Sequence, residues 1–219
     1  CYGTAVTGDY NVSIGWGAAS GNAAPGDFCV SLGYLAAKNN TGEGAISIGK
    51  NANQWSTGNY NIMIGADAGK SSTGVGRTGY SNIGIGRESL LGITSGIQNI
   101  AIGTGAAAAL TTENHNVMIG GGGAATCSQS IIIGNGAGWN GTGDNAVFIG
   151  YQAGAAWTSG DRQVGIGYQA LTASTSGVYN LAIGGFALLA NTTGNYNTAM
   201  GDSALKTNVH GDLSTAIGY

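Results

Sequence analysis

A step from an aliphatic residue to glycine recurs along this 219-residue chain about every 17 residues, and it constrains the fold more than any other feature. The intervals between successive motif glycines are 18, 16, 16, 21, 17, 17, 14, 16, 17, 17, 17 and 17 residues. A period kept from end to end is typical of a solenoid, in which each repeat is one coil stacked on its neighbour. The motif glycines are Gly15, Gly33, Gly49, Gly65, Gly86, Gly103, Gly120, Gly134, Gly150, Gly167, Gly184, Gly201 and Gly218.

Two apolar positions precede each motif glycine, one and three residues before it, and most of them carry Ile or Val. Apolar β-branched residues at alternate positions predict a short strand with one buried face, because side chains alternate between the faces of a strand. Alanine three residues after most motif glycines indicates a thin interior. We therefore expect the aliphatic row to fill that interior, with Ile14, Ile48, Ile64, Ile102, Ile133, Ile149 and Ile183 as its structural residues.

The residue between the two aliphatic positions lies on the opposite face of each predicted strand. It is never charged, and examples are Ser13, Met63 and Phe148. A face directed to water should carry charge, so we expect this second face to be buried as well. A coil of about 17 residues is too small to enclose two interiors, which favours association of several chains about an axis.

These patterns predict an all-β fold, a parallel β-roll or β-solenoid of about 13 coils of about 17 residues each. We expect residues 1–219 to form a single repeat solenoid, because no linker or change of composition divides them. The chain starts partway into a repeat and stops one residue after a motif glycine, as expected for a segment of a longer fibre.

Composition excludes several classes of protein. Only 8% of residues are charged and the net charge is -3, so no basic stripe points to nucleic acid or to an anionic membrane. No apolar run approaches the ~20 residues that cross a bilayer. Cys1, Cys29 and Cys127 are scattered and odd in number, which argues against a disulfide framework or a metal site.

The segments NVSIGWGAA, NIMIGADAG, NLAIGGFAL and NTAMGDSAL resemble the repeats of phage tail-fibre proteins and the head repeats of trimeric autotransporter adhesins. The resemblance covers nearly the whole chain and implies a left-handed parallel β-roll in a homotrimeric fibre. It also implies an extracellular place, on a virion tail fibre or a bacterial surface. We expect a structural shaft or head that presents turns for attachment to a host or surface, with self-association, a host surface glycan and other fibre proteins as partners.

Two polar patterns are candidate sites. Acidic residues follow the turn glycine in several repeats, and stacked carboxylates can bind Ca²⁺ through oxygen ligands, although Gly-Asp is also ordinary turn chemistry. These candidates are Asp9, Asp27, Glu43, Asp144 and Asp161. Asparagine begins the strand in many repeats, so we expect stacked amides to form a hydrogen-bonded ladder. Its consecutive members are Asn61, Asn82, Asn99 and Asn116.

Surface binding, if this segment has any, is expected at the variable turn between Lys70 and Arg77 and at aromatic residues beside the motif glycines. Tyr151 and Tyr168 are two of those aromatic residues, and aromatic rows can stack on sugar rings or pack between coils and subunits.

An enzyme is not expected and neither is a cofactor. His115 and His210 lie more than five coils apart, too far for a shared site within one chain. A left-handed β-helix acyltransferase is the less favoured alternative, with His115 as its candidate histidine. A further alternative is an extracellular filament or an ice-binding solenoid, for which the interrupted row of threonines before the turn glycines is the only sign. That row comprises Thr7, Thr41, Thr57, Thr78, Thr142 and Thr193.

Overall fold

The computed structural model describes residues 8–21, 26–71, 76–120 and 125–219. The chain forms two compact units, residues 1–115 and residues 116–219, and each is described by itself. Within the described residues, the regular secondary structure consists of three-residue strands and contains no helix. That a single solenoid domain spans 1–219 stays a prediction.

Each strand ends one residue before a motif glycine, as the sequence predicts. The first unit contains β1 (Val12–Ile14), β2 (Val30–Leu32), β3 (Ile46–Ile48), β4 (Ile62–Ile64), β5 (Ile83–Ile85) and β6 (Ile100–Ile102). The second unit contains β7 (Val117–Ile119), β8 (Ile131–Ile133), β9 (Val147–Ile149), β10 (Val164–Ile166), β11 (Leu181–Ile183), β12 (Thr198–Met200) and β13 (Thr215–Ile217).

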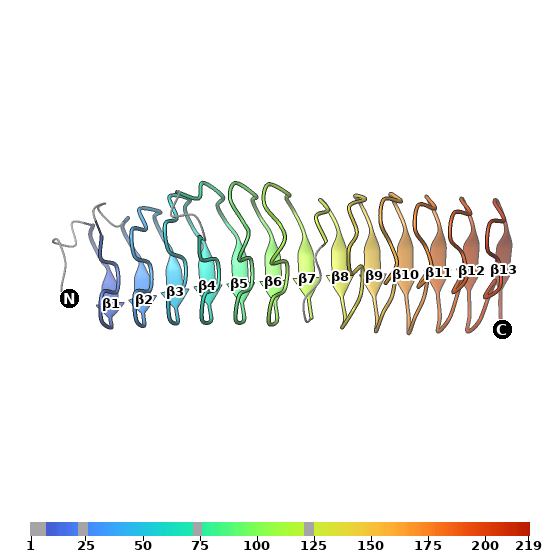
Figure 1. The fold of residues 1–219 in the computed structure, drawn as a ribbon, viewed down its shortest axis with the longest axis horizontal. Helices are drawn as coiled ribbons and strands as arrows, with labels where there is room; N and C mark the ends of the chain where they lie inside the picture. Colours follow the sequence, from blue (N-terminus) through green and yellow to red (C-terminus); the bar gives the residue numbers. More distant parts are fainter. Residues whose placement is uncertain (1–7, 22–25, 72–75, 121–124) are drawn as a thin grey trace. The chain divides into compact units, whose positions relative to one another are not determined.

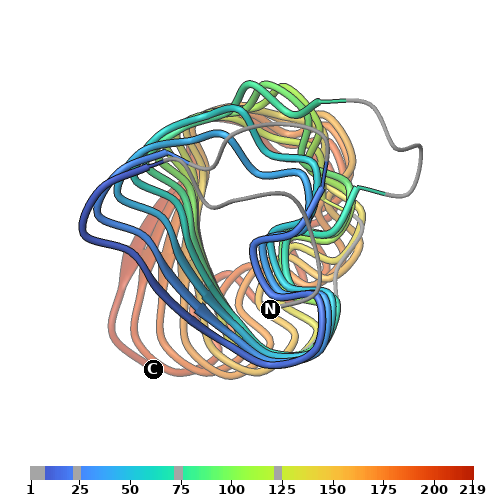
Figure 2. The ribbon, with the colours of Figure 1, turned by 90° about the vertical axis from the view of Figure 1, so that its left-hand side faces the viewer.

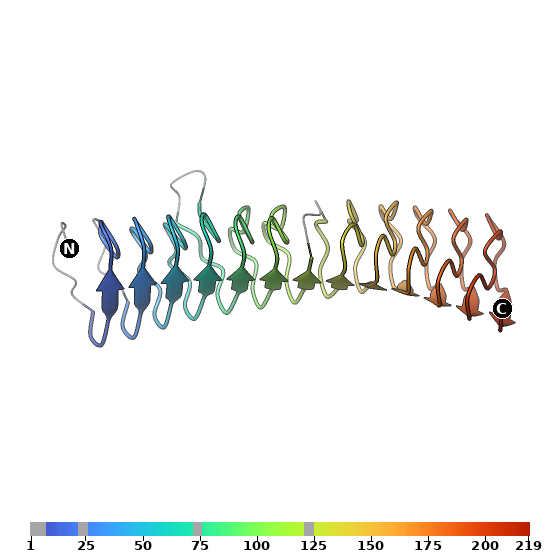
Figure 3. The ribbon, with the colours of Figure 1, turned by 90° about the horizontal axis from the view of Figure 1, so that it is seen from below.

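Within each unit every strand pairs in parallel with the next strand of the sequence (Figures 1 and 3). The register joins equivalent residues, so Ile14 pairs with Leu32 in the first unit and Ile166 with Ile183 in the second. Seen end-on, successive coils of the first unit turn at corresponding places (Figure 2). The predicted parallel β-solenoid is therefore confirmed, with about 17 residues per turn and about 11 turns rather than 13.

The motif glycines form a column in which no other residue fits. Their φ angles lie between 120° and 138°, a region of backbone conformation that is essentially restricted to glycine. A Cβ atom on Gly150 would lie 2.3 Å from the carbonyl oxygen of Gly167, the motif glycine of the next coil. Each coil thus rests its backbone directly on the backbone of the next, which explains why the aliphatic-glycine step recurs without exception.

The side-chain directions of the strands are the reverse of those predicted. The middle residue of each strand points into the coil, and Met63, Ala101 and Phe148 are fully buried. The flanking aliphatic residues point outward, and none of the seven predicted interior isoleucines is buried. Those seven are Ile14, Ile48, Ile64, Ile102, Ile133, Ile149 and Ile183.

The interior is thin, and this explains the correction. The alanine three residues after the motif glycine lies opposite the strand and is buried, as at Ala36, Ala52 and Ala170. Small or unbranched side chains mostly fill the facing middle position of the strand, including Ser31 and Ser47. Two rows of branched aliphatic residues would not fit between the strand and this alanine layer.

The residue five before each motif glycine has a left-handed backbone, with φ between 54° and 63° in every coil. Only Gly44 among these residues is a glycine, and the others include Tyr60, Arg162 and Tyr179. A left-handed conformation costs a non-glycine residue about 1–2 kcal/mol. It is retained because it aims the N–H group at the previous coil, as where Tyr60 donates to the Glu43 carbonyl at 2.7 Å.

We expect Gly150→Ala to destabilise the second unit by about 3 kcal/mol or more, because the new methyl group meets backbone and the φ angle is unsuitable. Gly136→Ala is the matched control: its φ is +70° and its Cβ would meet only the flexible Gln152 side chain, at 3.3 Å. The control should cost about 1 kcal/mol. Urea unfolding followed by circular dichroism measures both, and equal losses would contradict the glycine column.

Candidate functional site

The largest candidate site is the outward strand face, formed in each coil by the residues five, three and one before the motif glycine and the residue just after it. In the coil of β4 these residues are Tyr60, Ile62, Ile64 and Ala66. The alternation of the strand directs the two aliphatic side chains outward, and the left-handed backbone at Tyr60 places its ring at one edge. The face therefore has two aliphatic rows between two edge rows.

The aliphatic rows contain no charged residue and remain partly open to solvent. Ile85, Ile102 and Ile119 are each 36% exposed, and Ile131 is 39% exposed, although each packs against its neighbours in adjacent coils. Partly exposed Ile or Val on every strand of a sheet face except β12 is unusual for a protein surface, where charged residues normally alternate with apolar ones. The outward strand face thus has the composition of an interior and the exposure of a surface.

Aromatic rings stack from coil to coil along the two edge rows. Tyr10 lies over Phe28 with centroids 5.1 Å apart, and Trp16 lies over Tyr34 at 5.0 Å. In the second unit Tyr151 stacks on Tyr168 at 5.4 Å. Of the roles considered for these aromatic residues, packing between coils is present in the structure, and a role in surface binding stays a prediction.

The size of the face can be estimated from strand geometry. Seven residues across and five or six strand spacings along give roughly 500–600 Å² in each unit. The apolar part of this footprint is smaller, because the edge rows also carry Lys50, Arg87, Arg162 and Asp202, and a face of this kind occurs in both units. Each footprint is somewhat smaller than the ~800 Å² that each partner buries in a standard stable interface, so a stable association would use the faces of both units.

The asparagine ladder forms at the buried edge of the strands, as predicted. The Asn82 side-chain oxygen accepts from the Asn99 backbone N–H at 3.0 Å and from the Asn99 amide at 3.1 Å. The Asn82 amide donates in turn to the Asn61 side-chain oxygen at 3.2 Å and to the Gly96 carbonyl at 2.8 Å. Every hydrogen-bonding group of the Asn82 side chain is thus used to join coils.

In the second unit, Asn116 donates to the Cys127 carbonyl at 2.7 Å and accepts from the Ser130 N–H at 3.0 Å. Asn180 and Asn197 repeat the ladder geometry, with the Asn197 amide donating to the Asn180 side-chain oxygen at 3.1 Å. The structural role predicted for these asparagines is confirmed by these bonds.

The predicted calcium ligands belong to a second ladder, which we call the edge ladder. Its positions lie six residues before the motif glycine, where an Asp or Asn oxygen of one coil accepts the backbone N–H of the previous coil. Asp27 accepts from Asp9, Asp161 from Asp144, and Asn59 from Glu43, at 2.8, 2.9 and 3.0 Å. Within the described ranges, no three His, Cys, Asp or Glu residues gather as a metal site would require. The carboxylates of Asp27, Asp144 and Asp161 therefore act as backbone caps between coils, and Asp9 and Glu43 contribute backbone N–H groups to the edge ladder.

The variable turn places its two basic residues differently from expectation. Lys70 is partly exposed and forms an ion pair with Asp67 at 3.1 Å. Arg77 was predicted as a surface residue, but it is 3% exposed and its guanidinium donates to the Asn53 side-chain oxygen at 3.2 Å and to the Gly69 carbonyl. Burial lowers the pKa of Arg77 to about 10. Arg77 therefore joins Gly69 to Asn53 in the coil interior and is not available to a ligand on the surface.

No catalytic constellation appears among the residues that the structure describes. His115 is exposed on an edge row of the outward strand face, and His210 contacts the hydroxyl groups of Thr192 and Thr193. Cys29 and Cys127 are buried thiols, and burial raises the pKa of the Cys29 thiol. Cys1 and Thr7 lie outside the described residues.

Threonines do form a row across coils, but their hydroxyl groups clamp backbone. Thr142 donates to the Thr158 carbonyl at 2.7 Å, Thr158 to Thr175 at 2.9 Å, and Thr175 to Thr192 at 3.1 Å. These threonines differ from the row predicted before the turn glycines, except for Thr142. Their hydroxyl protons are engaged between coils, so the row gives no support to an ice-binding face.

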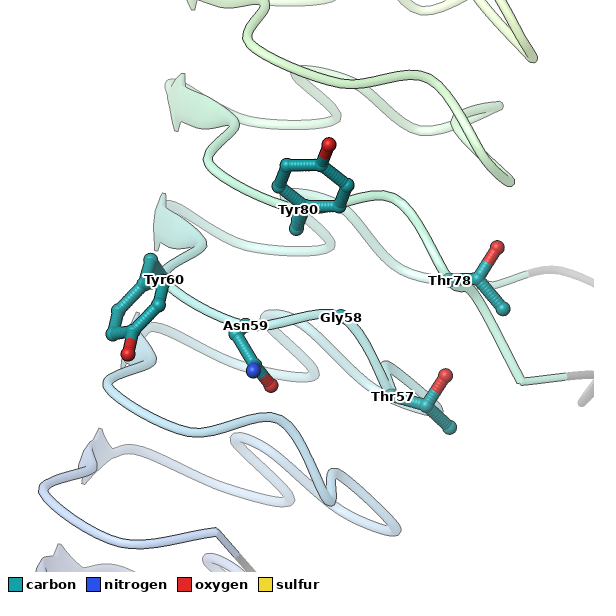
Figure 4. Close-up of a pocket in the computed structure, with 6 residues that line it drawn as sticks. All are labelled: Thr57, Gly58, Asn59, Tyr60, Thr78 and Tyr80. Atoms are coloured by element: carbon teal, nitrogen blue, oxygen red, sulfur yellow. The ribbon is translucent and has the colours of Figure 1, made fainter.

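Sequence reasoning missed one local feature, a hollow of about 250 Å³ lined by Thr57, Gly58, Asn59, Tyr60, Thr78 and Tyr80 (Figure 4). It lies between two consecutive coils of the first unit. The sequence carries a signal for it, because Tyr80 occupies an edge-ladder position at which most coils have Asp, Asn, Glu or Ser.

Comparison with known proteins gives no relative: no family model, no curated protein and no solved structure matches the chain. In the part of the chain that the structure describes, no helix has the length and apolarity needed to span a bilayer.

We expect Asn82→Ala to lower the free energy of unfolding by about 2–4 kcal/mol. The substitution leaves buried donors and acceptors of Asn61 and Asn99 without hydrogen-bond partners. Asn135→Ala, at an exposed position just after a motif glycine, should have little effect. Thermal unfolding of both variants tests the asparagine ladder, and an unchanged midpoint for the Asn82 variant would contradict it.

The strand Ile131–Ile133 offers a matched test of the side-chain directions. Ile132→Asp places a charge in the interior and should cost at least about 3 kcal/mol. Ile133→Asp places the same charge on the outward strand face and should leave the coil folded. Circular dichroism melting in dilute solution measures the stability of both variants. A greater loss of stability for the Ile133 variant would show that Ile133, and not Ile132, points into the coil, as predicted from the sequence.

Proposed function

We propose that this chain is a structural module of an extracellular fibre, a shaft or head built from three copies that associate through their outward strand faces. The observation that carries the proposal is the partly exposed, largely aliphatic surface of each unit, whose two central rows carry no charge and, in the second unit, include Thr198 and Thr215 as polar members. Such a surface is stable in water only when it is covered, and another copy of the same surface is always present.

The edge rows support a parallel arrangement of copies in register. In such an assembly the residue five before the motif glycine meets the residue just after the motif glycine of the neighbouring chain. Bulky and small residues then face each other in three coils, as Tyr60 with Ala66, Tyr179 with Gly185, and Lys50 with Gly44. In the first two coils ring faces ring instead, so aromatic contacts would form there.

The number of copies rests on the resemblance to trimeric fibre repeats. With three chains, the two aliphatic rows of each face point toward a common axis and each edge row meets the opposite edge row of a neighbour. Closed symmetry of this kind leaves no outward strand face uncovered.

The mechanical role follows from the hydrogen-bond directions. Strand pairing, the asparagine ladder, the edge ladder and the threonine clamps all join one coil to the next, so a pull along the stack loads many bonds at once. A structural fibre requires this property and requires no catalytic group. Attachment to a virion or a bacterial surface belongs to the same proposal and is supported by the resemblance of the repeats alone.

Native mass spectrometry of the 219-residue chain tests the proposal. We expect a particle of three chains, and we expect Ile133→Asp combined with Ile183→Asp to convert it to folded monomers, because two charges would be buried against like charges. Asn140→Asp, an added carboxylate on an exposed residue outside the outward strand face, should leave the particle trimeric. A wild-type chain that stays a folded monomer at micromolar concentration would overturn the proposal.

A further inference from the structure

The hollow beside Tyr80 arises where the edge ladder is broken. In most coils an Asp or Asn oxygen caps the backbone N–H of the equivalent residue in the previous coil, as Asn59 caps Glu43 and Asp212 caps Asn195. Tyrosine has no oxygen that can reach this N–H, and the Tyr80 ring extends into solvent with 46% exposure. Within the described part of the chain, the Asn59 N–H consequently has no acceptor.

The backbone around the hollow fixes the direction of that N–H. The Ser81 N–H donates to the Asn59 carbonyl at 2.9 Å, so the two coils remain paired on one side of the gap. On the other side Thr57 donates its hydroxyl to the Arg77 carbonyl at 3.2 Å. The space between these bonds, which an Asp or Asn side chain fills elsewhere, is the hollow.

The lining has a definite chemistry. It contains two tyrosine rings, two threonine hydroxyls and one asparagine amide, and no charged side chain. Figure 4 shows Thr57, Asn59 and Tyr60 along one coil and Thr78 and Tyr80 along the next. The hydroxyl groups of Tyr60, Thr78 and Tyr80 have no hydrogen-bond partner among the described residues, whereas the Thr57 hydroxyl donates to the Arg77 carbonyl. The surface offers aromatic faces, hydroxyl donors and acceptors, and one uncapped backbone donor.

We propose that this hollow is a binding site for a neutral saccharide. A sugar ring presents apolar C–H groups that pack on tyrosine and hydroxyl or carbonyl oxygens that accept hydrogen bonds. One such oxygen takes the place of the missing edge-ladder oxygen on the Asn59 N–H. The volume of about 250 Å³ suits a monosaccharide or one terminal residue of a longer glycan. The absence of a charged lining residue favours a neutral sugar over a sulfated or phosphorylated one.

The site lies within one chain and goes beyond the structural role, on which it does not depend. If the chain does associate as proposed, the side of the Tyr60 ring that meets Ala66 of a neighbour is covered, and the hollow between the two coils recurs in every chain, so weak single-site binding gains by multivalency.

Tyr80→Asn is the decisive variant, because it restores the edge ladder while removing the site. The new asparagine oxygen caps the Asn59 N–H and fills the hollow, so the melting temperature should rise while saccharide binding falls at least about tenfold. Val178→Asn is the matched control. It completes the edge ladder at Asp161 in the second unit, and should raise stability without changing saccharide binding.

The measurement is binding of the 219-residue chain to an array of neutral oligosaccharides built from glucose, galactose, mannose and N-acetylglucosamine, with sulfated forms alongside. The best neutral probe is then titrated by saturation-transfer NMR against the wild type, both asparagine variants and Tyr80→Leu, which removes the ring but leaves the N–H free. Binding of a neutral probe that is lost in both Tyr80 variants and kept in Val178→Asn supports the site.

Three results would overturn it: no neutral probe binding at millimolar concentration, equal binding by Tyr80→Asn, or a preference for sulfated probes. Native mass measured on the same samples keeps this outcome separate from the structural proposal, since the Tyr80 variants should not change the number of chains.

Discussion

Contact between glycine backbones sets the geometry of every coil. Because the carbonyl group of one motif glycine occupies the place where a Cβ atom would stand on the previous one, the coils stack at the closest distance that backbones allow. Close stacking at this column keeps equivalent residues in register over the rest of the coil. The strand pairing, the amide ladders and the stacked rings are therefore consequences of one repeated steric constraint, and each adds stabilisation only because the register is already fixed.

The same constraint decides which side chains face water. A coil of this length encloses little volume, and the alanine layer represented by Ala36 and Ala170 takes part of it. Only one residue of each three-residue strand then points inward, often a small one, while two branched aliphatic residues point outward. A chain that buried only its own interior would leave this surface exposed. The small interior of each coil is therefore the reason that the outward strand face needs a partner.

The sequence was sufficient to predict the solenoid, the strand positions and the asparagine ladder, because each depends on a residue type that recurs at a fixed place. It was insufficient for the strand faces, since alternation shows that two sets of side chains lie on opposite sides and does not show which side is inside. The small residues at the middle position, such as Ser47 and Ala101, carried that information. The burial of Arg77 could not be predicted, because it depends on a local insertion. Tyr80 marks a departure from the edge-ladder pattern, but the sequence does not show that a hollow forms there, since Ile97 and Val178 depart from the pattern as well.

Departures from the repeat are where a solenoid can differ along its length. Where an edge-ladder position carries Asp or Asn, the side-chain oxygen accepts a hydrogen bond from the neighbouring coil and is not free to bind a ligand. Where it carries Tyr80, the capping bond is lost and the backbone donor, the ring and the gap appear together, in the first unit beside the one long insertion between coils. One edge-ladder position can therefore either stabilise the stacking of coils through a capping hydrogen bond or form part of a binding site. A solenoid of this kind can gain a binding site by losing a single capping hydrogen bond.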